Sequence, residues 1–158
     1  MAGQEQRSLA ERLGTFNFSE EARQALEFAI GKGRNFGYIE TTHILLGLLN
    51  NPGNKACKLL LTKRDLNLQT IKANVDFLLE HEKRDLSKDT PINFTPRAKN
   101  AVLFALTEAA KEDNQGTIDT HHLLFGLLSD RNAIATVLLE PYGITQENLT
   151  ELRKMTKP

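Results

Sequence analysis

Two stretches of the chain decide its fold: Ile39–Leu49 reads IETTHILLGLL, and Ile118–Leu128 reads IDTHHLLFGLL. Upstream of them lies a second matching pair, FSEEA at Phe18–Ala22 and FTPRA at Phe94–Ala98. The two copies are offset by 76 residues at the phenylalanines and by 79 at the shared histidines, so the second copy carries three extra residues between its motifs. Such a duplication predicts two pseudo-symmetric subdomains and makes the groove between them the first place to look for function.

The upstream motif of each copy opens an amphipathic helix. Apolar residues recur at i, i+3, i+4, i+7 and i+8 through Ala22–Ile30 and again through Ala98–Leu106. This spacing places them on one helical face, which we expect to be buried. Ser19 and Thr95 precede the two stripes, where a hydroxyl can accept a hydrogen bond from an unpaired backbone N–H.

The downstream motif predicts a central buried helix in each copy, because it is apolar on nearly every side. Thr41 and Thr120 are its expected N-caps. Gly47 and Gly126 stand in the same position of the two helices. A glycine there costs about 1 kcal/mol relative to alanine, so its recurrence predicts a close contact with another helix.

Two further helices follow in each copy, the third over roughly Asn54–Leu61 and Arg131–Leu139, and the fourth from Asn67 or Thr145. The expected core positions of the fourth helices are Leu68, Ile71, Val75, Leu78 and Leu79 in copy one, and Leu149, Leu152 and Met155 in copy two. No alternating stretch is long enough to predict a sheet. The predicted fold is all-α, with two tandem four-helix repeats in a pseudo-twofold arrangement.

The predicted organisation has four parts. Residues 1–15 form an N-terminal extension, in which Leu9 and Leu13 suggest a short leading helix. Residues 16–80 form the first repeat and residues 93–158 the second. Between them, residues 81–92 are rich in charges of both signs, a pattern typical of a solvated linker.

The composition excludes several classes of protein. The 158 residues contain 20 Lys and Arg against 20 Asp and Glu, a balance that gives no electrostatic footprint for nucleic acid or an anionic membrane. The single cysteine suits a reducing compartment. No apolar run has the length of a membrane span. We expect a cytoplasmic protein, or a stromal one if its source is a plastid.

Motifs for catalysis or cofactor binding are missing from the sequence. It contains no phosphate-binding loop, no G-x-S-x-G turn and no H-E-x-x-H helix, so we expect no enzyme activity and no cofactor. Cys57 sits beside a leucine run and is interpreted as a packing residue. His43 and His122 are interpreted as structural histidines that hydrogen-bond a backbone carbonyl, and no metal site is expected. A hydrolase that uses Asp119 with His121 and His122 is an alternative of another class.

The helix starts are the remaining candidates for a site. A helix N-terminus presents free N–H groups and a positive dipole end to anions. If the copies pack about a pseudo-twofold axis, the starts and the turns before the buried helices could line related pockets. The candidate binding residues are Ser19, Thr95, Glu40, Thr42, Asp119 and His121, whereas Gly47 and Gly126, like the two histidines, are structural.

These doubled motifs resemble the Clp N-terminal domain, the duplicated helical module that precedes the ATPase rings of ClpA- and ClpC-type chaperones. The resemblance covers roughly Phe16 to Met155. It implies two four-helix repeats and a non-catalytic module that binds adaptors and substrates. No ATPase motif follows in this chain, so we expect either an excised domain or a stand-alone paralogue.

One departure from the family pattern concerns ligand recognition. ClpC-type members usually read Ile-Gly-Thr-Glu-His, and the resemblance implies that the glutamates hold the guanidinium of phosphorylated arginine. Thr42 and His121 occupy those glutamate positions here, and Glu40 and Asp119 replace the glycines. A guanidinium favours charged bidentate acceptors, so we expect phosphoarginine not to be bound.

The predicted function is therefore a non-catalytic protein-binding module of the Clp chaperone and protease system. It would dock adaptors or substrates, or regulate the Clp complex, with a Clp ATPase or protease core as a possible further partner and no nucleic acid or membrane. The alternative is a protein that sequesters a small ligand or peptide at the interface between its repeats.

Overall fold

The computed structural model describes residues 15–80, 92–112 and 116–156. The leading helix expected around Leu9 and Leu13 lies outside these ranges, as does the predicted linker except for Ile92. Across the described part of the chain, no helix combines the length and the apolar character needed to cross a bilayer.

The first helices of the two copies are α3 (Glu20–Gly33) and α7 (Pro96–Ala110). Their predicted N-caps are confirmed, because the hydroxyls of Ser19 and Thr95 accept hydrogen bonds from the N–H groups three residues further on. The alanine-rich stripes are buried as expected. Small side chains on these faces let the neighbouring helices approach closely.

The central helices are α4 (Thr41–Leu49) and α8 (Thr120–Leu128), and every residue of both is buried. The close approach predicted at their glycines is confirmed. A β-carbon on Gly47 would lie 2.1 Å from the carbonyl oxygen of Ala25, and one on Gly126 would lie 2.0 Å from that of Ala101. The backbones of α4 and α3, and of α8 and α7, therefore meet where only glycine fits.

The predicted N-caps of the central helices are wrong by one residue. Thr41 and Thr120 are the first helical residues, and Glu40 and Asp119 are the N-caps, with extended backbones and carboxylates that accept from the next N–H. His43 and His122 complete a capping box by accepting the N–H of the cap residue. A longer acidic side chain with a reciprocal partner three residues on thus takes the place of the threonine hydroxyl.

The third helices are α5 (Lys55–Leu60) and α9 (Ile134–Leu139), followed in copy two by a 3₁₀ turn, η2 (Glu140–Tyr142). Helix α9 begins later than the predicted Arg131, because the side chain of Asp130 accepts from the Asn132 N–H and holds a turn there. Gly143 ends the segment in the left-handed region with φ 75°.

The fourth helices are α6 (Leu68–Glu80) and α10 (Leu149–Thr156), the latter preceded by the 3₁₀ turn η3 (Gln146–Asn148). Two of their expected core positions are wrong: Leu78 is 40% exposed and Met155 is 47% exposed. Leu78 falls outside the stripe that Ile71, Val75 and Leu79 form on the buried face of α6.

The predicted all-α fold class is confirmed, and a small sheet accompanies the helices. Strands β1 (Tyr38–Ile39) and β2 (Asn93–Phe94) pair in parallel, with Ile39 opposite Phe94. Phe18 and Ile118 form the corresponding parallel bridge between the other two segments. Two-residue pairings lie below the length at which an alternating pattern can be recognised, so the sequence could not indicate them.

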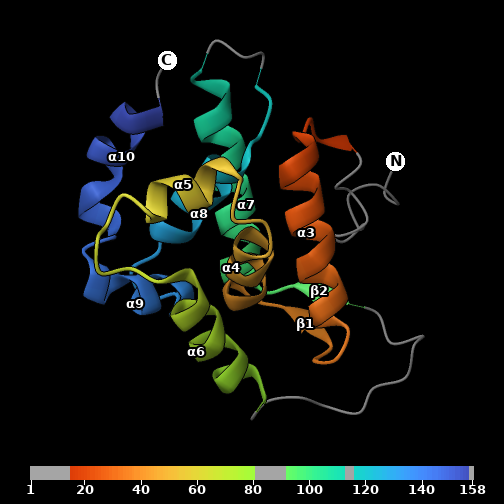
Figure 1. Cartoon of the computed structure of the whole chain (residues 1–158). Coiled ribbons are helices and arrows are strands. Elements are labelled where there is room, and N and C mark those ends of the chain that lie inside the picture. The colour runs from red at the N-terminus through yellow and green to blue at the C-terminus, as the bar shows by residue number, and fades with distance from the viewer. Residues whose placement is uncertain (1–14, 81–91, 113–115, 157–158) are drawn as a thin grey trace.

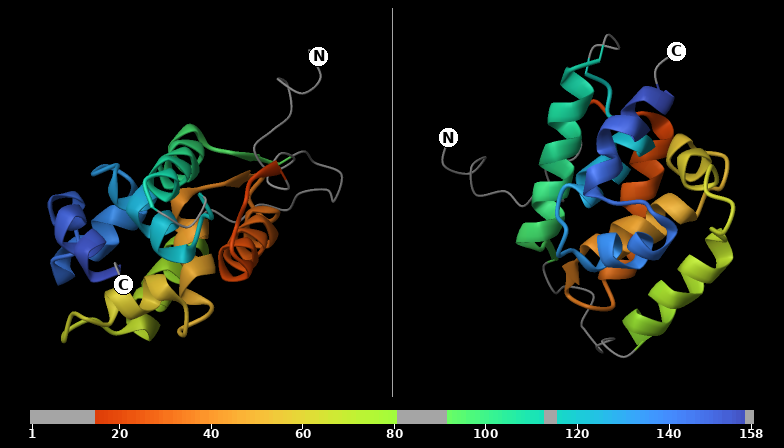
Figure 2. Two further views of the ribbon diagram at one scale, coloured as in Figure 1. Left: turned by 90° about the horizontal axis from the view of Figure 1, so that it is seen from above. Right: turned by 90° about the vertical axis from the view of Figure 1, so that its left-hand side faces the viewer.

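The two repeats are interlocked. Helices α4 and α8 lie in the middle of the molecule, while α6 and α10 lie on its outside (Figures 1 and 2). Both third helices contact both central helices, so that α5 packs on α8 and α9 packs on α4 as well as on the helix of its own copy. The start of each first helix likewise lies beside the turn that precedes the central helix of the other copy.

Candidate functional site

The first junction between the repeats joins the start of α3 to the turn before α8. The Ser19 N–H donates to the Ile118 carbonyl at 2.9 Å, and the Ser19 hydroxyl donates to Asp119 Oδ1 at 2.9 Å. The same hydroxyl oxygen accepts from the Ala22 N–H at 3.1 Å. We call this arrangement the Ser19–Asp119 junction. The Ser19 hydroxyl therefore donates its proton to a carboxylate of the same chain and is not available as a donor to a ligand in this conformation.

The second junction repeats this geometry with the copies exchanged. The Thr95 N–H donates to the Ile39 carbonyl at 3.0 Å, and the Thr95 hydroxyl donates to Glu40 Oε1 at 2.7 Å. Its oxygen accepts from the Ala98 N–H at 3.2 Å. In this Thr95–Glu40 junction and in its counterpart, four of the six candidate residues come together as two pairs. Each pair joins residues from different repeats.

Charge distinguishes the two junctions. Burial alone would raise the pKa of Asp119, but hydrogen bonds from the Thr120 N–H and the Ser19 hydroxyl, together with the Lys55 ammonium, hold that pKa below its ordinary value. The Lys55 ammonium lies 3.3 Å from Asp119 Oδ2. At the 79-residue offset of the copies, Lys55 corresponds to Ile134, so the Thr95–Glu40 junction has no equivalent lysine.

The other two candidate residues lie in the interior. Thr42 and His121 are each only 2% exposed. The His121 side chain reaches Glu112, with Nε2 3.3 Å from Oε1, and makes no hydrogen bond to the hydroxyl of either junction. Because both side chains are covered, a ligand on the surface of this conformation would meet the two acid–hydroxyl pairs and not these residues.

His121, His122 and Glu112 form a cluster that the sequence did not reveal. His122 Nε2 lies 2.7 Å from the Glu112 oxygen that also faces His121. Counting at the 76-residue offset, Glu112 corresponds to Phe36, whose ring packs 4.9 Å from the ring of His43. No motif or spacing in the sequence could have placed Glu112 beside the second histidine, because the contact between Phe36 and His43 is itself known only from the folded chain.

The hydrogen bonds of this cluster favour a structural role. Its three ligand-type atoms lie within 4.8 Å of one another, a spacing that also suits a metal ion. However, His122 Nδ1 accepts the Asp119 N–H at 2.9 Å, so in the neutral ring the proton sits on Nε2 and points to Glu112. A metal ion at Nε2 would move this proton to Nδ1, which could then no longer accept the Asp119 N–H, so the capping bond would break.

His43 is held by the equivalent capping bond in copy one. Its Nδ1 accepts the Glu40 N–H at 2.8 Å, and this bond replaces the backbone-carbonyl contact that was expected.

Two groups that could serve as nucleophiles, the Ser19 hydroxyl and the Cys57 thiol, are hydrogen-bonded within the chain. The Ser19 hydroxyl donates directly to a carboxylate, and the described residues place no histidine between the two. Cys57 is fully buried, its thiol donates to the Leu48 carbonyl at 3.1 Å, and burial raises its pKa to about 11. A thiol with this pKa stays protonated near neutral pH, which makes it a poor nucleophile.

The junctions also lead to a prediction about phosphoarginine. A phosphate placed at Ser19 or Thr95 would meet Asp119 or Glu40, a like charge at hydrogen-bond distance of the same hydroxyl. We expect no saturable binding of free phosphoarginine at millimolar concentration, as measured by chemical-shift titration. Saturable binding that Ser19→Ala or Thr95→Ala abolishes, while Thr107→Ala on the exposed face of α7 does not, would contradict this expectation.

The comparisons with known proteins agree on one family. A family model described as the Clp repeat (R) N-terminal domain matches residues 17–111 and 93–156. The chain is 30% identical over 145 residues to the chloroplastic chaperone protein ClpC2 of Oryza sativa subsp. japonica, a match that covers 90% of this chain and 15% of the relative. It thus spans about one seventh of the length of that chaperone.

Solved structures share the fold at lower sequence identity. The N-domain of ClpV from Vibrio cholerae superimposes with a TM-score of 0.69 at 20% identity, covering 88% of this chain and 84% of that one. A complex of a ClpV N-domain with a VipB peptide superimposes with a TM-score of 0.65 at 20% identity, covering 88% and 86%.

Proposed function

Because the chain belongs to the Clp repeat (R) N-terminal domain family, we propose that it is a non-catalytic module that docks adaptor or substrate proteins of a Clp chaperone and protease system, or that regulates such a complex. The observation that carries this proposal is the interlocked pair of repeats. The side chains of Ser19, Cys57 and His122 near the junctions form hydrogen bonds within the chain, in helix caps and in the core.

Two further observations support a role in binding. Large apolar side chains remain on the surface, including Ile134 at 45% and Val137 at 50% exposure. A structural neighbour, the ClpV N-domain, was solved with a peptide bound. Ile134 and Val137 lie three residues apart on α9 and so share one face of that helix, and a contiguous exposed apolar patch rimmed by polar residues marks a protein-interaction site. The relative described above is chloroplastic, so the proposed location is the stroma, or the cytoplasm if the source has no plastid.

Competition with a complete chaperone tests this proposal. The purified chain is added in excess to a reconstituted Clp ATPase and protease that degrades one substrate through an adaptor and another without one. If the chain captures adaptors, degradation of the adaptor-delivered substrate should slow, while degradation of the direct substrate should continue. An unrelated folded protein at the same concentration serves as the control for nonspecific inhibition. Equal degradation with and without the folded chain, together with no detectable binding to the ATPase, protease or substrates, would refute the proposal.

A further inference from the structure

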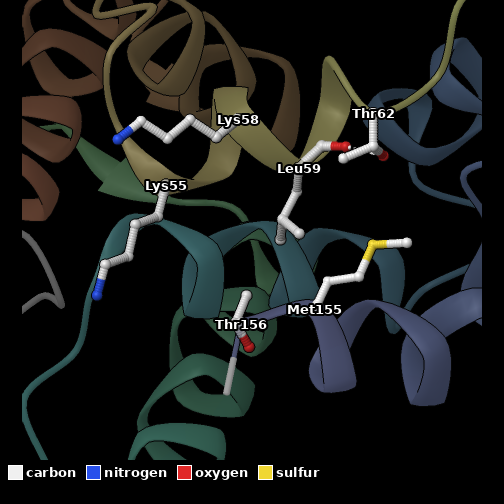
Figure 3. Close-up of a pocket in the computed structure, with 6 residues that line it drawn as sticks. All are labelled: Lys55, Lys58, Leu59, Thr62, Met155 and Thr156. Carbon is white, nitrogen blue, oxygen red and sulfur yellow. Dashed lines mark hydrogen bonds between the residues drawn. The ribbon is translucent and has the colours of Figure 1, made fainter. Parts of the chain in front are cut away.

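A groove between α5 and α10 lies outside the two junctions. Its cavity volume is about 480 Å³. Figure 3 shows its lining, which consists of Lys55, Lys58, Leu59, Thr62, Met155 and Thr156. Helix α5 belongs to the first repeat and α10 to the second, so the groove spans the two repeats.

The groove has an apolar end and a cationic end. Leu59 and Met155 lie toward one side, while the ammonium groups of Lys55 and Lys58 extend toward the other (Figure 3). Lys55 has Asp119 as a neighbour, but within the described ranges the ammonium group of Lys58 forms no hydrogen bond or ion pair. Among the residues that the structure describes, no acidic side chain lines the groove. A ligand here therefore meets an exposed thioether and a positive charge that the described residues leave unneutralised.

The internal symmetry shows that this charge is particular to one side of the molecule. At the 79-residue offset, Lys55 and Lys58 correspond to Ile134 and Val137, which are exposed apolar residues on α9. At the 78-residue offset that relates the fourth helices, Met155 corresponds to Phe77, which is 67% exposed. An exposed apolar residue therefore occurs in both repeats, as Met155 and as Phe77. The two lysines occur only on α5, because α9 has apolar residues at the equivalent positions.

This asymmetry specifies the chemistry of an occupant. A purely apolar partner would gain nothing from Lys58, and desolvating an unpaired ammonium would weaken its binding. A partner with carboxylates next to one large apolar side chain would match both ends. We propose that the α5–α10 groove binds a short acidic segment of a partner protein, with its apolar side chain on Leu59 and Met155 and a carboxylate at Lys58. This inference rests on the proposed docking function.

Fluorescence anisotropy with labelled peptides tests the groove. The probe is a pentapeptide DDLDD, compared with DDSDD, which lacks the apolar side chain, and KKLKK, which reverses the charge. We expect DDLDD to bind most tightly. Lys58→Glu should weaken its binding about tenfold, equivalent to about 1.4 kcal/mol. Met155→Asp should weaken it similarly, because it removes the apolar contact and adds a like charge.

The matched control is Lys99→Glu. Lys99 is an exposed lysine of α7 that does not line the groove, so this variant makes the same change of net charge elsewhere. Circular dichroism verifies that each variant is folded. Equal losses from Lys58→Glu and Lys99→Glu, or equal affinities for DDLDD and DDSDD, would overturn the groove assignment. If the peptides fail to bind but the chain still slows adaptor-dependent degradation, only the groove inference fails; if both assays are negative, the docking function fails as well.

Discussion

Replacing Gly126 by alanine should destabilise the fold by about 3 kcal/mol, the upper part of the range for overpacking a core. The new β-carbon would lie 2.0 Å from the carbonyl oxygen of Ala101, a backbone atom that cannot move without shifting α7 against α8. Gly47→Ala should have a similar effect, since its β-carbon would meet the Ala25 carbonyl oxygen at 2.1 Å. For a domain of this size we expect the melting temperature to fall by roughly 10 °C.

Gly31→Ala is the matched control for these two variants. Gly31 also lies within a helix, α3, but among the described residues no atom apart from its chain neighbours and its own helix backbone lies within 4 Å of its β-carbon position. Alanine should therefore stabilise the protein there by up to about 1 kcal/mol through its higher helix propensity. Urea unfolding followed by circular dichroism distinguishes the three variants. If Gly126→Ala and Gly31→Ala unfold at the same urea concentration, the helices do not meet at Gly126 as described.

Lowering the pH from 7 to 4 should weaken the fold through His43 by about 3 kcal/mol. This side chain is fully buried, its Nδ1 accepts the Glu40 N–H, and its Nε2 has no partner among the described residues. Burial, with a smaller effect of Lys32, lowers its pKa from 6.5 to about 4. The unfolded chain therefore binds this proton more readily, so the stabilisation is complete above pH 6.5 and declines until about pH 4.

A titration of stability separates this effect from others. Burial also lowers the pKa of His121, so the wild-type protein should lose stability through both residues in the same direction. His43→Asn keeps an oxygen near the position of Nδ1 but removes the titrating ring. It should be less stable at pH 7 yet show a shallower dependence on pH between 6.5 and 4. Equal slopes for the variant and the wild type would show that His43 does not titrate as described.

Features that depend on neighbours in sequence could be predicted without coordinates. The caps at Ser19 and Thr95 and the alanine stripes follow from helical periodicity, which acts over a few residues. The close approach at Gly47 and Gly126 could be predicted because the duplication shows the same residue twice in one position. Errors occurred where two local solutions compete, as when Glu40 and Asp119 displaced the adjacent threonines as caps.

The candidate site was predictable only in part. Its helix starts could be named, but their partners could not, because Ser19 and Asp119 lie 100 residues apart and Thr95 and Glu40 lie 55 apart. Glu112 carries no motif, and only the folded chain places it against His122. Met155 reads as a core residue by its spacing, yet packing leaves it half exposed beside the groove.

The sequence by itself determined that two equivalent helical halves exist, where their first helices start, and which helix positions must lie close to a neighbour. These are consequences of propensity and periodicity, which act along the chain. Only the tertiary structure decided that the hydroxyl at the start of the first helix in each half donates to the N-cap carboxylate in the other half. It also decided that the lysines of α5 and the methionine of α10 line one groove. Such pairings depend on how buried faces pack across many residues, and no local preference encodes them.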